Sequence, residues 1–174
     1  MCLICDRIEM KKLFVIGLLV SMCASGVYAQ SRAIGLRLSN SFEVSYQMDA
    51  GSSNFWEFDG GMWYWGRGCQ ATALYNWIFA SPRWSSRGDW NWYAGVGGSL
   101  GFIWANRYHH GNEDLGCFVG VAGICGLEYN FWFPLSVSVD LRPIIAPYFG
   151  DGVYFNSDVF VSAFYPTIAA RYTF

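Results

Sequence analysis

Alternation of apolar and polar side chains is the feature that most restricts how this chain can fold. In its last stretch, Ile168, Tyr172 and Phe174 fall on one face of an extended strand, whereas Arg171 and Thr173 fall on the other. Successive side chains of a strand point to opposite sides, so a period of two predicts a strand with one apolar face. An amphipathic helix would instead repeat its apolar residues at intervals of three and four. The pattern therefore indicates a β-sheet protein.

The same alternation recurs along the chain, interrupted by clusters of Gly, Ser, Asn and Asp that are typical of turns. It predicts strands within residues 34–39, 42–48, 56–64, 70–79, 92–102, 119–129, 135–142 and 167–174. These are eight segments, an even number as single-chain bacterial outer-membrane barrels require. We therefore expect an all-β fold, an antiparallel up-and-down barrel of about eight strands.

The N-terminal part of the chain is typical of a secretory signal peptide. A pair of lysines precedes an apolar run over residues 13–20, and a cleavage site with small residues ends at Ala29. This is the order of a basic, an apolar and a small-residue region that export requires. We expect residues 1–29 to be removed, with Met10 the better translation start, and residues 30–174 to form one domain. The apolar run is too short for a membrane-spanning helix, which takes about 20 residues.

The composition of residues 30–174 argues against a water-facing exterior. Both lysines precede this part, which keeps eight arginines against eleven carboxylates, whereas a soluble β domain covers its outer face with charged residues of both signs. The chain is 20% aromatic and 53% apolar, yet no long apolar run occurs. Apolar faces directed at lipid explain this combination, so we expect a transmembrane barrel. A soluble lipocalin-like binding barrel is the lesser alternative, and nothing basic enough for nucleic-acid binding remains.

The opposite faces of the predicted strands carry charged residues interleaved with glycine, serine and threonine. If the apolar faces point outward, these charges face the barrel lumen, and an unpaired charge there would be costly. Small residues such as Gly95, Gly97 and Gly101 suit the narrow interior of an eight-stranded barrel. We therefore expect a plugged lumen with a paired network of three arginines and five carboxylates, namely Arg37, Glu43, Glu57, Asp59, Glu128, Asp140, Arg142 and Arg171.

The connections and strand ends give the predicted topology. With the N-terminus on the periplasmic side, the outer loops are predicted at residues 39–41, 65–68, 105–116 and 147–157 and the periplasmic turns at 49–53, 81–89 and 130–134. Aromatic residues gather at strand ends, as interfacial girdles do; they include Trp56, Tyr64, Trp65, Trp77, Phe79, Trp90, Trp92 and the run 129–133. Pro143 and Pro166 lie within strand-like runs, where a proline removes a ladder hydrogen bond, so we expect a bulge or break at each.

The chain resembles the small outer-membrane barrel family of the outer-membrane protein A and X type. The resemblance is carried by the signal peptide, the eight alternating segments and the C-terminal Arg171-Tyr172-Thr173-Phe174. Residues 91–98 and 126–130 are similar to uncharacterised small barrels of Gram-negative anaerobes. The resemblance implies location in the cell outer membrane, contact with its lipid and lipopolysaccharide, and a monomer. It also implies that Tyr172 and Phe174, with Ala170 and Ile168 before them, form the signal read by the barrel-assembly machinery.

Catalysis, metals and cofactors are not expected. Some barrels of this size modify lipid A with a histidine, a serine and an acid, but here His109 and His110 lie beside Glu113 and Asp114 in a predicted loop and match no catalytic motif. We expect a non-catalytic barrel with an envelope-structural, adhesion or surface-interaction role, the alternative being a lipid A-modifying enzyme or a narrow pore. Three cysteines follow the signal peptide, and an odd number cannot all form disulfides with each other. A disulfide between Cys69 and Cys117 is not expected, because it would join strands that are not neighbours.

Overall fold

A computed structural model of the chain describes residues 32–63, 66, 68–104, 116–149, 153–155 and 166–174. The elements in these ranges are all β-strands: β1 (Arg32–Leu38), β2 (Ser41–Asp49), β3 (Asn54–Trp63), β4 (Gly68–Ala80), β5 (Gly88–Ile103), β6 (Gly116–Phe131), β7 (Ser136–Leu141), β8 (Ile144–Ile145), β9 (Pro147–Phe149), β10 (Val153–Phe155) and β11 (Thr167–Thr173). No helix long and apolar enough to cross a membrane occurs within the described ranges. The predicted signal peptide lies outside them.

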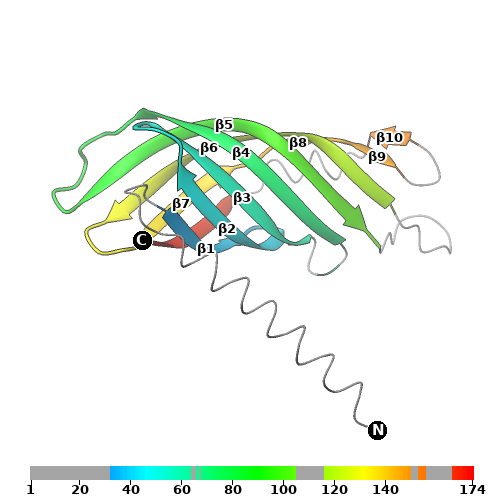
Figure 1. Ribbon diagram of the computed structural model, residues 1–174, viewed down its shortest axis with the longest axis horizontal. Coiled ribbons are helices and arrows are strands. Elements are labelled where there is room, and N and C mark those ends of the chain that lie inside the picture. Colours follow the sequence, from blue (N-terminus) through cyan, green and yellow to red (C-terminus); the bar gives the residue numbers. More distant parts are fainter. Residues whose placement is uncertain (1–31, 64–65, 67, 105–115, 150–152, 156–165) are drawn as a thin grey trace, which may run out of the picture.

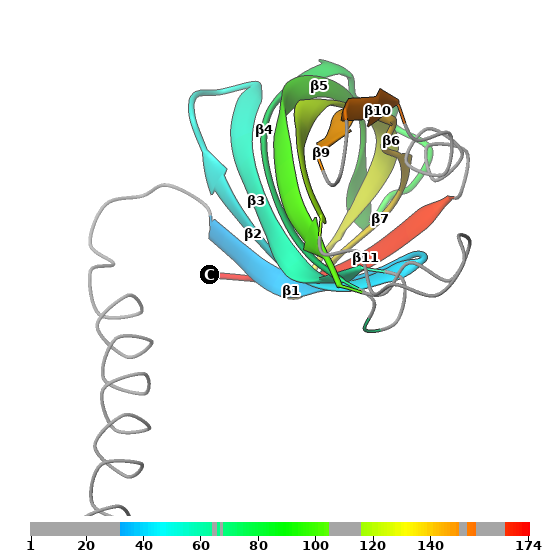
Figure 2. The ribbon, with the colours of Figure 1, turned by 90° about the vertical axis from the view of Figure 1, so that its right-hand side faces the viewer.

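The strands close into an antiparallel barrel, as Figures 1 and 2 show. Each strand from β1 to β6 pairs with the next, β6 pairs with β7, β7 with β11, and β11 with β1. Closure is completed by the backbones of Arg32 and Phe174, whose amides each donate to the carbonyl of the other at 3.1 and 2.8 Å. Because β7, β8 and β9 lie in line along β6, the barrel has eight strand positions, which confirms the predicted all-β antiparallel barrel.

The seventh strand position is interrupted at Pro143 without losing its register. Leu141 pairs with Cys125 and Ile145 with Val121, the spacing of an uninterrupted antiparallel ladder. Proline has no amide to donate, but its carbonyl accepts from the amide of Gly123 at 2.8 Å. The break expected at this proline is therefore confirmed. At the other predicted break, β11 begins immediately after Pro166.

Two strand predictions differ from the structure. Residues 147–157, predicted as one outer loop, contain strands β9 and β10, which pair with each other as a hairpin while β9 also extends the β6 ladder. Strands β5 and β6 are each 16 residues long and run several residues beyond their predicted ends. The added ends of β5 and β6 include glycine and asparagine, which have low strand propensity, but each of these long strands supplies hydrogen-bond partners for the other.

The two ends of the barrel differ. The terminal mouth, as we call the end at which Arg32 meets Phe174, also holds the connections at residues 50–53, 81–87 and 132–135. The β4–β5 and β6–β7 connections project at this end in Figure 1. The opposite end holds the short connection at residues 39–40 and the adjoining ends of β5 and β6.

The alternation predicted from the sequence sets the burial of every barrel strand. In β1, Arg37 is 1% exposed while its neighbours Leu36 and Leu38 are 47% and 48% exposed. The same inversion holds around the barrel, where the large apolar side chains exposed on the outside include Val44, Phe58, Val96, Leu100, Val121, Val139, Ile145 and Ile168. Eight charged side chains lie inside, and most of the large apolar side chains of the strands lie outside.

Candidate functional site: the charge network in the barrel lumen

The inward faces of the strands bring together all eight charged residues singled out from the sequence. They come from β1, β2, β3, β6, β7, β11 and the residue that follows β7, and none is more than 8% exposed: Arg37, Glu43, Glu57, Asp59, Glu128, Asp140, Arg142 and Arg171. Each lies on the inner face because the period of two places it there. Residues more than 100 positions apart in the chain thus meet in one network.

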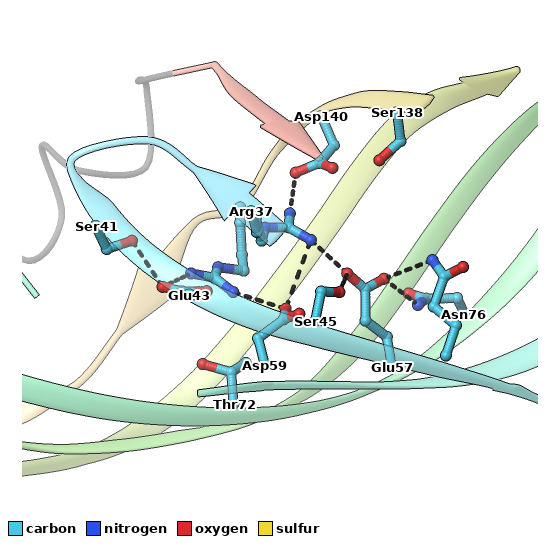
Figure 3. Close-up of polar contacts among 12 residues, drawn as sticks. Arg37, Ser41, Glu43, Ser45, Glu57, Asp59, Thr72, Asn76, Ser138 and Asp140 are labelled. Carbon is cyan, nitrogen blue, oxygen red and sulfur yellow. Dashed lines mark hydrogen bonds and ion pairs between the residues drawn. The ribbon is translucent and has the colours of Figure 1, made fainter. Parts of the chain in front are cut away.

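Arg37 lies at the centre of this network (Figure 3). Its Nη1 donates to Glu57 Oε1 and its Nη2 donates to Asp140 Oδ1, so one guanidinium joins β1 to β3 and to β7. Asp59 Oδ2 lies 3.5 Å from Nη1. The planar guanidinium has five donors in a fixed fork, which lets it hold several carboxylates at once, as a lysine ammonium could not do with the same geometry.

Arg142 and Arg171 bind further carboxylates of the network. Arg142 donates from Nη2 to Glu43 Oε1 at 2.6 Å and from Nη1 to Asp59 Oδ2 at 2.9 Å. Arg171 donates to Glu57 Oε1 at 2.6 Å, and its other nitrogens donate to the hydroxyls of two serines, Ser45 and Ser138, both at 2.9 Å. Apart from the bond to Ser138 on the adjacent strand β7, these bonds cross the lumen between strands that are not neighbours, so the network ties the barrel wall together from inside.

Neutral polar side chains complete the polar wall of the lumen. Asn76 donates to Glu57 Oε2 at 3.2 Å, and Gln70 donates to Glu43 Oε1. Thr72 and Ser99 share a hydrogen bond of 2.9 Å. Buried carboxylates need such donors because each oxygen has two lone pairs, and a buried polar atom without a hydrogen bond costs free energy.

An apolar cluster fills the other side of the lumen and was not predicted as a unit. Its buried members are Phe55, Leu74, Tyr93, Ile103, Phe118, Ala122, Ile124, Ile144 and Ala146. Tyr93 joins the apolar side of the lumen to the charged side. Its ring packs edge-on against that of Phe55, with centroids 5.5 Å apart, and its hydroxyl donates to Asp140 at 2.8 Å. Ile124 has the same parity as Glu128 on β6, so extending the alternation along that strand would have placed it inside. Charges and apolar side chains together plug the lumen.

Glycines keep the interior narrow where the β4 and β5 backbones approach closely. A Cβ atom on Gly97 would collide with the carbonyl oxygen of Ala73 and the Cα of Leu74. The neighbouring Gly98 faces outward, and a Cβ there would make only an ordinary contact of 3.8 Å with Gly120. Position 97 therefore has no room for a side chain, whereas position 98 does.

We expect Gly97→Val to destabilise the barrel by about 3 kcal/mol or more, because backbone atoms cannot move aside as a side chain can. The matched control is Gly98→Ala. Its free energy of unfolding should lie within about 0.5 kcal/mol of that of the unsubstituted protein. Denaturant titration of the folded protein in detergent, followed by tryptophan fluorescence, measures both. An equal loss in the two variants would show that the close approach at residue 97 is not what limits the fold.

The C-terminal residues predicted as the assembly signal lie on the outer face of β11. Tyr172 and Phe174 are 57% and 53% exposed, and their rings stack with centroids 6.4 Å apart. Ile168 extends this outward row toward the start of the strand. Arg171, which directly precedes Tyr172 in the chain, points into the lumen network.

No metal site is found in the part of the chain that is described. Within it, no group of three or more His, Cys, Asp or Glu side chains is arranged to hold a metal ion. His109 and His110, with Glu113 and Asp114, lie outside the described residues. Cys69, Cys117 and Cys125 are free thiols. Cys69 and Cys117 each pair with Phe102, from opposite sides of β5, so a full strand separates them.

The comparisons with known proteins give no relative: no protein-family model, no curated protein and no solved structure matches the chain.

Proposed function

We propose that the chain is an integral outer-membrane barrel, of the small outer-membrane protein A and X type, that acts without catalysis through its surface. Its role would be structural in the envelope, adhesive or receptor-like. The observation that carries this proposal is the inverted barrel, with apolar side chains exposed all around the outside and eight charged side chains buried within. A closed barrel is one of two structures that satisfy every backbone group in lipid.

The outer face is hard to reconcile with a soluble binding barrel. Monomeric soluble proteins rarely expose continuous apolar patches larger than a few hundred Å². Here Val44, Val96, Val121 and Ile168, from four different strands, are each about half exposed or more. A lipocalin-like protein would also keep its lumen apolar and open for a ligand, whereas this lumen holds three arginines bonded to carboxylates.

Aromatic side chains around the terminal mouth support contact with a membrane interface. Trp56, Tyr75 and Trp77 form a row with ring centroids 4.8 and 5.2 Å apart across β3 and β4. A second row begins with Trp90 and Tyr129, whose ring centroids are 4.6 Å apart. It continues through Phe131 at the end of β6 to Phe133 in the connection between β6 and β7. Amphipathic rings favour the headgroup region. On this proposal the terminal mouth faces the periplasm, and the C-terminal row of Tyr172 and Phe174 is the contact for the assembly machinery.

The plugged lumen favours a surface role over a pore. The network around Arg37 and the apolar cluster around Phe118 occupy the interior between them, and opening a path would break several buried ion pairs. Single-channel recording in planar bilayers tests this alternative, and stepwise conductance from the purified barrel would support a pore.

The membrane proposal is tested by the behaviour of the purified protein. A folded barrel in detergent should migrate faster on a gel before boiling than after, and it should partition with membranes on fractionation. A protein that stays soluble without detergent and shows no heat-dependent migration would refute the proposal. The enzyme alternative is tested separately, by lipid A analysis of a deletion strain complemented with the unsubstituted gene or with His109→Ala and His110→Ala.

A further inference from the structure

A polar pocket opens at the terminal mouth of the barrel. It has a volume of about 220 Å³ and is lined by residues from all eight strand positions. Its polar groups include the carboxylates of Asp49 and Glu128, the amides of Asn91 and Asn130, and the hydroxyl of Ser136. No lysine, arginine or histidine lines it among the described residues. The pocket therefore offers hydrogen-bond acceptors and negative charge.

Glu128 is the carboxylate that the lumen network satisfies least. Its Oε1 accepts from Asn130 at 3.2 Å, but Oε2 has no hydrogen-bond partner. The nearest cation to Oε2 is Arg171 Nη1 at 3.7 Å, beyond hydrogen-bond distance. Arg171 already donates at 2.6 Å to Glu57, so Glu128 shares this guanidinium with a closer carboxylate. The network holds three arginines for five carboxylates, and Glu128 is the one of the five that lines the pocket.

A second acceptor in the pocket is also without a partner. Ser136 is 1% exposed and lines the pocket, and its Oγ has no hydrogen-bond partner. Buried polar atoms in native proteins are nearly always bonded to protein, water or ligand. Two unpartnered oxygens, one of them charged, thus face the same space.

We propose that this pocket binds a primary ammonium group carried on a short aliphatic chain. An ammonium has three N–H donors and no acceptor, which matches a carboxylate, a hydroxyl and amide oxygens. A cavity of about 150 Å³ holds benzene, so this one has room for about nine non-hydrogen atoms, the size of a small diamine. A metal ion is less well matched, because no three His, Cys, Asp or Glu side chains converge among the described residues. The pocket faces the periplasm if the proposed function holds.

The test uses the folded protein in a non-ionic detergent, so that no headgroup amine competes. Titration with 1,5-diaminopentane, followed by isothermal calorimetry, should show one saturable site at millimolar concentrations or below. The uncharged analogue 1,5-pentanediol should not bind. Glu128→Gln should weaken diamine binding about tenfold or more, because it removes a charge-assisted hydrogen bond. Asp89→Asn, an exposed carboxylate at the same end but outside the pocket, should leave the affinity unchanged.

A second variant protects the test from misfolding of Glu128→Gln. Ser52 is exposed and lines the pocket, so Ser52→Lys should place a tethered ammonium in it and abolish diamine binding while the fold is retained. No saturable heat with the diamine, equal binding of the diol, or binding of calcium chloride alone at similar affinity would each overturn the proposal. None of these results depends on membrane location, which the gel-migration and fractionation experiments decide separately.

Discussion

Arg37→Met is expected to destabilise the folded barrel by about 3–5 kcal/mol, the usual cost of removing one partner from a buried ion pair. Methionine fills much of the arginine's volume but leaves Glu57 and Asp140 without the guanidinium that holds them both. Asp59 Oδ2, 3.5 Å from the same guanidinium, loses part of its compensation as well. Urea titration in detergent, followed by tryptophan fluorescence, measures the free energy of unfolding.

Two control variants separate the loss of charge from the loss of packing. Arg37→Lys keeps a cation but cannot reach carboxylates on two sides at once, so it should fall between methionine and the unsubstituted protein. Combining Arg37→Met with Asp140→Asn removes the carboxylate whose arginine partner is Arg37, leaves Glu57 with Arg171, and should recover part of the loss. If the free energy of unfolding of Arg37→Met lies within about 0.5 kcal/mol of that of the unsubstituted protein, the network does not stabilise the barrel.

Val96→Arg is expected to cost about 2–4 kcal/mol when the barrel is folded in lipid vesicles, as measured for arginine on the lipid face near the bilayer midplane. Val96 lies near the middle of β5 and is 54% exposed on the outer face. If this face were exposed to water, the substitution would change the free energy of unfolding very little, because the guanidinium would be fully hydrated. The substitution therefore distinguishes a lipid-facing surface from a solvent-facing one.

The matched control is Phe79→Arg, at the end of β4 near the terminal mouth. Phe79 is exposed to a similar extent, at 62%, but it lies where the interface is expected. Its cost should be about 0–1 kcal/mol, since charged residues near the interface reach the headgroups. Equal and small effects at both positions would argue that the outer face does not contact hydrocarbon.

The lumen network links strands that do not pair with each other. Each of the three arginines bonds to at least one residue on a strand that is not its neighbour. Tyr93 extends the same connection to the apolar side through Asp140. A shift of β1 against β7, or of β11 against β3, would therefore break a buried bond.

Local periodicity accounts for the parts of the fold that could be predicted. Which side chains point inward depends only on the alternation along one strand, so Arg171 and Tyr172 are placed on opposite faces before any partner strand is known. The count of eight strand positions follows in the same way. The extent of β5 and β6 does not, because Gly88 and Asn130 extend the ladder only when a long neighbour is already in place.

An antiparallel barrel with charged side chains facing inward could be predicted without coordinates, because the alternation of a strand depends only on consecutive residues. Which arginine meets which carboxylate could not be predicted, as the contact between Arg37 and Asp140, 103 positions apart in the chain, illustrates. That choice depends on the curvature of the whole barrel and on the stagger between its strands. The same curvature and stagger leave Glu128, alone among the eight predicted lumen charges, in the lining of the pocket.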